Sequence, residues 1–372
     1  MKILVLTKRH HMGLDALTHL HGRCFAIPEE LACLGHDVRG LVADYRPEQE
    51  KGNNGSPSDP AVSWELLPIR SGPLLRFDRY LRAIRATIRT FEPDLIWTGS
   101  DALITVAGER AAGRYGIPSV IDLKDNYEAF GLTRLPGLRR LLHSAIRNAH
   151  AVTCASQDLS RYASQHGAHR TLHLPNAADG HRFRPIDRNQ VRAQLDLSTD
   201  LRLFGTAGSL TSDRGIDILS RAAAILGSKR GDTGLLVAGP RDDSWQPPTN
   251  LPVHDLGHIS VEKVPLVLNA LDVGVICNVP GQFGSYCYPQ KLHEMLACHL
   301  PVVAARTGPF ASTPTPPGVV STYPPDSPGE LANAIENALA SPPEWTGSTA
   351  RDTWHDRANS FIDFVHPLAS RP

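Results

Sequence analysis

Residues 286–304 read YCYPQKLHEMLACHLPVVA and join an amphipathic segment to an apolar run. Pro289 suits the first position of a helix, where its missing N–H costs nothing. The spacing therefore predicts a helix over residues 289–298, with Leu292, Met295 and Leu296 on its buried face. The run at residues 302–304 predicts a strand covered on both faces. The stretch is one helix-then-strand unit of an α/β fold.

The same alternation of short apolar runs and longer amphipathic stretches extends over nearly the whole chain. Further strands are predicted at residues 3–7, 38–43, 95–98, 119–123, 151–154, 171–174, 201–206, 234–238, 253–256, 273–277 and 318–321. Helices are predicted between them at residues 24–34, 74–90, 104–115, 156–164, 216–226, 261–270 and 327–339. Strands alternating with helices indicate doubly wound parallel sheets, and two sets of strands indicate two such domains.

Composition excludes several classes of protein. The chain has 372 residues, 38 Lys and Arg, and 38 Asp and Glu, so its net charge of zero argues against a dedicated nucleic-acid binder. The charge is uneven, because residues 1–184 hold 24 basic and 19 acidic side chains whereas residues 185–372 hold 14 and 19. No run approaches the roughly 20 apolar residues of a membrane-spanning helix. The N-terminal apolar run is too short for a signal peptide, so we expect a cytoplasmic protein.

Familiar cofactor motifs are missing from the sequence. The six cysteines form no Cys-x-x-Cys pair, and no Cys/His set has zinc-ligand spacing, so no metal is predicted. The first strand of neither predicted domain leads into Gly-x-Gly-x-x-Gly, and the Walker and Gly-x-Ser-x-Gly patterns are absent. Hydride transfer, P-loop hydrolysis and α/β-hydrolase chemistry therefore lose their main support.

Two segments of the second half have the character of anion sites. The helix start at residues 288–291 offers free N–H groups and a positive dipole end, and Glu294 follows about 7.5 Å along the axis. Residues 208–215, GSLTSDRG, place a glycine turn and Arg214 before another helix start. Either segment alone also fits a plain loop or a solvated carboxylate. Together they offer groups that bind phosphate near a carboxylate that could accept hydrogen bonds from ribose hydroxyls. This combination predicts a nucleoside diphosphate ligand.

These segments, with others along the chain, resemble retaining "group 1" glycosyltransferases, family 4 of the GT-B fold. The resemblance covers most of the length of the chain and begins with the opening strand, loop and helix. The other matching segments are Pro175-Asn176 with Phe183 and Pro185, Gly208…Arg214-Gly215, Val237-Ala238-Gly239, Gly257-His258-Ile259, and Glu294…Ala297…Pro301-Val302-Val303. It implies two Rossmann-like domains facing across a cleft. The acceptor domain would span residues 1–183, with a terminal helix over 351–369 crossing back to it, and the nucleotide-sugar domain residues 184–350.

The resemblance also implies a mechanism and a set of site residues. The leaving diphosphate would deprotonate the acceptor hydroxyl, so neither cofactor nor metal is expected. The chemistry would fall to Arg214, Lys291, Lys124 and Asp125. The donor would be held by Gly208, Ser209, Arg214, Gly239, His258, Ile259, Tyr286, Tyr288, Gln290, Lys291 and Glu294. The acceptor, a sugar or a lipid-linked molecule, would be held by His10, His11, Gly13 and Asp101.

The sequence departs from the family pattern at three positions. Tyr286 stands where a first Glu is common, Ser209 where an Arg is frequent, and Lys124 where a His is frequent. Two alternatives therefore stay open, a sugar-nucleotide-binding protein with impaired catalysis and a sugar-nucleotide epimerase. The arginines between residues 70 and 89 form either a solvated helix face or a peripheral contact with the inner face of the membrane. Assembly of surface polysaccharide is the expected setting.

Overall fold

The computed structural model describes residues 1–11, 14–19, 22–46, 61–129, 133, 135–243, 245–281, 284–286, 288–312, 318–345 and 353–369. The chain divides into two compact units, one of residues 1–176 with 354–372 and one of residues 177–353. Each unit is built on a parallel sheet with helices on both faces, which confirms the predicted fold class. The division falls earlier in the chain than the predicted boundary at residue 183.

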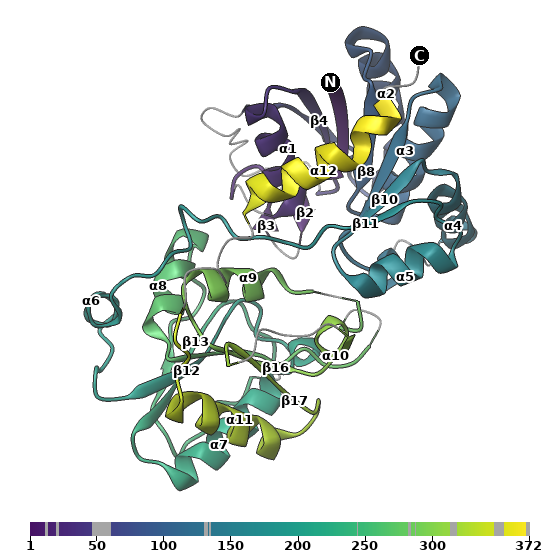
Figure 1. Ribbon diagram of the computed structural model, residues 1–372. Helices are drawn as coiled ribbons and strands as arrows, with labels where there is room; N and C mark the ends of the chain where they lie inside the picture. Colours follow the sequence, from purple (N-terminus) through teal and green to yellow (C-terminus); the bar gives the residue numbers. More distant parts are fainter. Residues whose placement is uncertain are drawn as a thin grey trace. The chain divides into compact units, whose positions relative to one another are not determined.

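The sheet of unit 1 has the strand order β11-β10-β9-β8-β1-β4-β5, with all neighbours parallel (Figure 1). Its strands, in that order, are Thr171–His173, Ala151–Cys154, Ser119–Leu123, Leu95–Gly99, Lys2–Lys8, Asp37–Asp44 and Ser63–Pro68. Two short hairpins, β2 (His10–His11) with β3 (Leu14–Asp15) and β6 (Arg70–Ser71) with β7 (Leu74–Leu75), follow separately. β5 was not predicted, because Ser63–Pro68 alternates in burial instead of forming one apolar run.

The helices of unit 1 are α1 (Arg23–Cys33), α2 (Phe77–Phe91), α3 (Ala102–Tyr115), α4 (Leu138–Asn148), α5 (Gln157–Gln165) and α12 (Trp354–Ala369). Apolar side chains of α2 and α3 pack on one face of the sheet, against Leu4, Leu6 and Ile96. α12 packs beside α1, and the rings of Phe361 and Trp97 lie 4.9 Å apart. The terminal helix is thus part of the core of unit 1.

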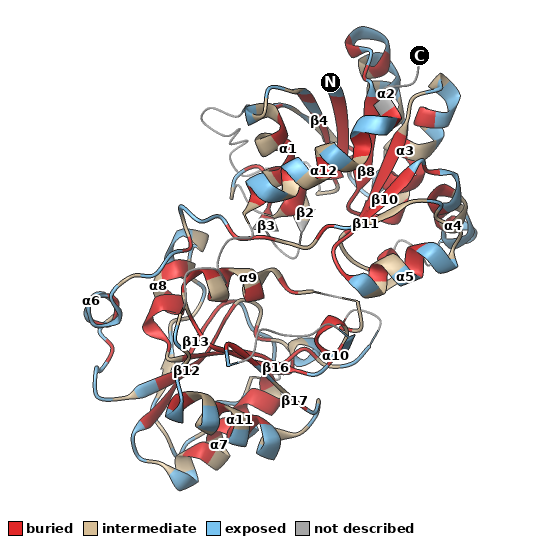
Figure 2. Cartoon of the chain, viewed as in Figure 1, coloured by how far each residue is buried: buried red, intermediate tan, exposed pale blue. Residues whose placement is uncertain are grey.

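The sheet of unit 2 has the order β14-β13-β12-β15-β16-β17. These strands are Val253–Asp255, Thr233–Ala238, Arg202–Ala207, Val273–Ile276, Val302–Ala305 and Val320–Tyr323. One core cluster contains residues of α6 (Arg188–Gln194), α8 (Val264–Ala270) and α9 (Gln290–Ala297), with Phe310 of α10 (Pro309–Ser312). The other contains residues of α7 (Ile216–Lys229) and α11 (Pro328–Ala340). Figure 2 shows the central strands of both units buried and the outer helix faces exposed.

Several element boundaries differ from the prediction for local reasons. The helix expected from residue 74 begins at Phe77, because Leu74 and Leu75 pair with the preceding strand. Pro289 is the N-cap of α9 rather than its first residue. The helices α4 and α6 were not predicted, although α4 buries Leu138, Leu142 and Ile146 at helical spacing. No helix in the described part of the chain is long and apolar enough to cross a membrane.

Candidate functional site

The strand order of unit 2 reverses between the neighbouring strands β12 and β15, and this reversal places a site at their carboxyl ends. The connection after β12 leads to β13 on one side, whereas β15 lies on the other side and continues to β16. Loops leaving two such strands part in opposite directions and leave a crevice at the carboxyl ends, where ligands of doubly wound sheets bind. The loop from Gly208 to Gly215 and the helix α9 both follow strands of this region.

Three glycines lie side by side at this edge, one after each of the strands β12, β13 and β14. The Gly208 N–H donates to the Ala238 carbonyl at 2.8 Å, and the Gly239 N–H donates to the Gly257 carbonyl at 2.7 Å. All three have positive φ, and a Cβ on Gly239 would lie 1.9 Å from the Gly208 carbonyl oxygen. The edge is therefore bare backbone, as close approach of a ligand requires.

Two cations converge on one pocket beside these glycines. Arg214, Lys291 and Ser209 line it together with Thr206 and other residues. The Lys291 Nζ donates to the Thr206 Oγ1 at 3.4 Å and lies where a Cβ on Gly208 would touch it at 3.3 Å. Arg214, in the short helix η4 (Ser212–Arg214), has only 12% of its side chain exposed. Two cations beside bare backbone suit the binding of an anion such as a diphosphate.

Glu294 is the buried carboxylate of this region. It lies one turn after Lys291 in α9 and is 7% exposed, and its Oε1 has no hydrogen-bond partner among the described residues. Burial raises the pKa of Glu294 to about 7, against the opposing effects of Lys291, Arg182 and Gln290. A buried carboxylate oxygen without a donor is costly in a native protein, so a ligand that brings hydroxyl donors is the natural complement.

The remaining predicted donor residues occupy separate places in unit 2. Tyr288 packs on Phe310 and His293, with ring centroids 5.7 and 5.4 Å away. The Gln290 side-chain amide donates to the Ala177 carbonyl at 2.5 Å, which ties α9 to the start of the unit. His258 is exposed after β14, whereas Ile259 packs on the core, and Tyr286 is half-buried.

The carboxyl edge of unit 1 has a charge cluster at its own point of strand reversal, between β1 and β8. Burial lowers the pKa of Lys8, at the end of β1, and nearby Lys124 lowers it further, while Asp101 and Asp125 oppose the shift. The Lys8 N–H donates to the Ser100 Oγ at 2.9 Å. The structure therefore brings the predicted Lys124, Asp125 and Asp101 together with Lys8. Lys8 was not predicted as a site residue, although its position at the end of the first strand of the sheet is typical of one.

The predicted acceptor residues have individual surroundings in unit 1. Asp101 is the N-cap of α3, where its Oδ1 accepts from the Ile104 N–H at 2.9 Å, and burial raises its pKa. His10 is half-buried, with its Nε2 3.7 Å from the Asp15 Oδ2 and its Nδ1 3.8 Å from the Asp44 Oδ1. Burial lowers the pKa of His10. Gly13 lies outside the described residues, and of His11 only the backbone is described.

Comparisons with known proteins divide the chain in a similar way. Residues 25–177 match the family described as a glycosyl transferase 4-like domain, and residues 202–341 match glycosyl transferases group 1. A GDP-mannose-dependent alpha-mannosyltransferase from Mycobacterium tuberculosis (strain CDC 1551 / Oshkosh) is 25% identical over 293 residues, which cover 75% of this chain and 73% of the relative.

Solved structures show the same fold at low sequence identity. Sucrose-phosphate synthase from Thermosynechococcus elongatus has a TM-score of 0.71 at 19% identity, covering 99% of this chain and 96% of the other. Anabaena Alr3699/HepE in complex with UDP has a TM-score of 0.68 at 19% identity, covering 99% and 97%. Since both halves match glycosyltransferase families and the whole chain has the fold of such enzymes, the protein belongs to the group 1 glycosyltransferases of the GT-B fold.

Proposed function

We propose that the protein moves a hexosyl group from a nucleoside diphosphate sugar to an acceptor hydroxyl, with retention of anomeric configuration. The supporting observation is the pocket of unit 2, where Arg214 and Lys291 gather beside the bare edge of Gly208. The buried carboxylate of Glu294 adds a place for ribose hydroxyls. We assign the reaction to the cytoplasm and to the assembly of a bacterial surface polysaccharide or glycoconjugate.

The two cations would act on the leaving group. As the bond between the anomeric carbon and the diphosphate oxygen breaks, negative charge accumulates on that oxygen, and preorganised cations stabilise it most in the transition state. The new bond to the acceptor oxygen forms on the same face of the sugar, and the departing diphosphate takes the acceptor proton. Because Arg214 and Lys291 supply the positive charge, we propose that the transfer needs no metal ion.

Acceptor binding is assigned to unit 1. The cluster of Lys8, Lys124 and Asp125 at the carboxyl edge of its sheet offers both charge signs within reach of a polar acceptor. The exposed Leu74 and Leu75 in β7, next to the arginine-rich α2, suit contact with a membrane that carries a lipid-linked acceptor.

The first experiment compares donor binding by wild type and Arg214→Ala. GDP-mannose is the first donor because of the mannosyltransferase relative, and UDP-glucose the second because a structural neighbour holds UDP. One donor should raise the melting temperature of the wild type by mass action. Arg214→Ala should bind the corresponding nucleotide at least tenfold more weakly than wild type. Without ligand, its melting temperature should equal that of wild type. Donor binding that the substitution leaves unchanged would remove Arg214 from the site.

Measurement of turnover distinguishes an enzyme from a protein that only binds the sugar nucleotide. The second alternative is open because Tyr286 stands where a Glu is common. With acceptor extracts and the donor that binds, we expect release of nucleoside diphosphate, and proton NMR of the product should show the anomeric configuration of the donor. A chelator should leave the initial rate unchanged. Binding without release would favour the binding protein, and conversion of the sugar without acceptor would favour the epimerase.

A further inference from the structure

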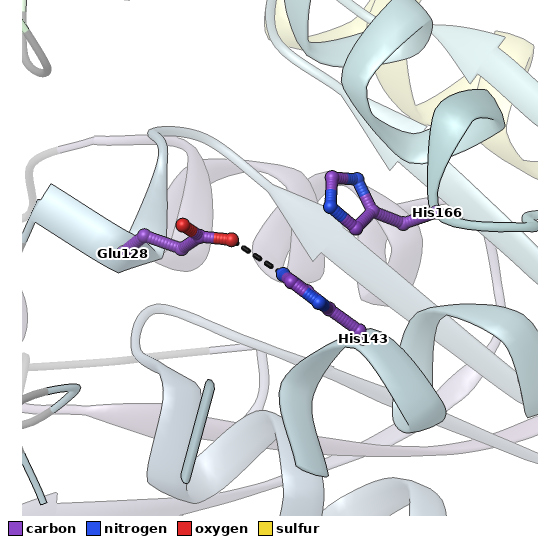
Figure 3. A group of neighbouring side chains, drawn as sticks. All are labelled: Glu128, His143 and His166. Carbon is purple, nitrogen blue, oxygen red and sulfur yellow. Dashed lines mark hydrogen bonds and ion pairs between the residues drawn. The ribbon is translucent and has the colours of Figure 1, made fainter. Parts of the chain in front are cut away.

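Three metal-ligating side chains meet in unit 1, and none of them is among the residues assigned above (Figure 3). Glu128 belongs to the short helix η2 (Tyr127–Ala129), His143 to α4, and His166 is the C-cap of α5. Their ligand atoms all lie within 4.8 Å of one another, and all three residues are half-buried. Three elements separated in sequence therefore present two imidazoles and a carboxylate at one point.

The hydrogen bonds around His166 prepare its ring for a ligand. The His166 Nδ1 lies 2.8 Å from the Tyr162 carbonyl oxygen. A carbonyl only accepts, so Nδ1 carries the proton and Nε2 keeps its lone pair in the neutral ring. Metal-binding histidines have this arrangement, with the second ring nitrogen donating to a backbone carbonyl. The ring of His143 lies with its centroid 4.0 Å from that of His166.

Outer contacts also hold the carboxylate of Glu128. The Tyr162 hydroxyl donates to its Oε1 at 2.8 Å, and the Arg139 Nε lies 2.8 Å from its Oε2. The His143 Nε2 lies 2.5 Å from the same Oε1. These partners fix the position of Glu128 and lower its pKa, although burial opposes the shift.

We propose that Glu128, His143 and His166 bind one divalent ion of the zinc class, with water as the fourth ligand. Two nitrogens and one carboxylate oxygen are ligands that Zn²⁺ accepts, at about 2.0–2.2 Å each. Ligands at these lengths around a tetrahedral ion are about 3.3 Å apart, so the contact between Glu128 and His143 must open by less than about 1 Å. The site goes beyond the proposed transfer reaction and takes no part in it. Its role is to tie η2, α4 and α5 together.

Zinc titration of the full chain tests the proposal in a Cys33→Ser background, because Cys33 is an exposed thiol. We expect one Zn²⁺ per chain after dialysis and a melting temperature that rises with Zn²⁺. His166→Gln and His143→Gln should each weaken binding at least tenfold. His355→Gln is the matched control, since the His355 Nδ1 lies 3.2 Å from the Glu30 Oε2 in a pair to which the described part of the chain adds no third ligand. It should bind Zn²⁺ as the parent does.

Cobalt substitution reports the coordination number of the ion and whether a thiolate is among its ligands. Co²⁺ in the site should give the visible bands of a four-coordinate ion without the near-ultraviolet charge-transfer band of a thiolate ligand. A parent protein that retains no Zn²⁺, a thiolate band, or unchanged binding in both folded histidine variants would overturn the proposal and leave a purely hydrogen-bonded cluster. Donor binding should be the same with and without Zn²⁺, so failure of this site and failure of the proposed function are distinguishable.

Discussion

Glu294 combines a cost in stability with a use in binding. Its carboxyl group has a pKa near 4.5 in the unfolded chain and about 7 in the folded protein. Between these values the unfolded state ionises while the folded state keeps its proton, so the free energy of unfolding falls as pH rises from about 4.5 to 7. Above that range the loss is complete, on the order of 3 kcal/mol at ~1.4 kcal/mol per pKa unit. A ligand with hydroxyl donors would recover part of it.

Glu294→Gln should therefore stabilise the unliganded protein and weaken nucleotide binding. Gln cannot ionise, so the variant should be more stable than wild type by about 1–3 kcal/mol at pH 8 and nearly equal to it at pH 5. Nucleoside diphosphate binding should weaken roughly 10- to 100-fold at pH 8, because a charge-assisted acceptor is lost. As pH drops below about 7 the terminal phosphate of the nucleotide takes up a proton, so the affinity of both proteins should fall. The affinity of wild type should fall more steeply, because Glu294 is protonated over the same range.

Denaturation and calorimetric titration at pH 5 and pH 8 measure both effects. Arg221→Gln, an exposed substitution on α7, serves as the control for a changed surface charge in the same unit. Nucleotide binding by Glu294→Gln that equals wild type at pH 8 would show that the ribose does not contact this carboxylate.

At the scale of elements, the glycine row makes the strand ends of unit 2 a single surface. Gly239→Ala would place a Cβ 1.9 Å from the Gly208 carbonyl at a φ of +138°, so backbone must move. We expect a loss of about 2–4 kcal/mol in the free energy of unfolding and at least tenfold weaker nucleotide binding. Gly231→Ala meets nothing within 4 Å and should be close to neutral. Urea unfolding compares them, and an unperturbed Gly239→Ala would show that this close approach is not required.

The helix α2 offers a second test at the same scale. Arg76 and Arg82 pair with Asp78, at 3.0 and 2.8 Å, whereas Arg85 and Arg89 are exposed cations further along α2. The double substitution Arg85→Gln/Arg89→Gln should reduce binding to vesicles with anionic lipid several-fold, and salt should weaken wild-type binding. Sedimentation with neutral vesicles is the control. Equal binding to both vesicle types, or no binding at all, would leave α2 as a solvated helix.

At the scale of the whole molecule, two units with separate cores should respond separately to mutation. Phe361 in α12 is fully buried against Trp97, so Phe361→Ala should cost unit 1 about 3–5 kcal/mol. The control Asp363→Ala changes an exposed position of the same helix. In calorimetry Phe361→Ala should lower one transition and spare the transition that nucleotide raises. A uniform loss across both transitions would indicate that the units unfold as one.

The sequence by itself determined the class of the fold and the position of most elements. Parallel strands buried on both faces appear as unbroken apolar runs, so the strands from residue 3 to residue 321 were predictable within a few residues. The strand β5 was not, because its half-buried residues mix exposed and covered positions. Gly208, Arg214, Lys291 and Glu294 were also predictable as candidates, since loops after strands and helix starts are local features.

Only the tertiary structure decided which candidates meet and what their surroundings are. The reversal of strand order at β12 and β15 brings Arg214 and Lys291 to one pocket, and burial in that packing raises the pKa of Glu294. The triad of Glu128, His143 and His166 has no sequence signature, because its ligands come from three elements instead of one short motif. Local spacing encodes helices, strands and caps, whereas contacts between distant residues and the dielectric around a charge exist only once the layers have packed.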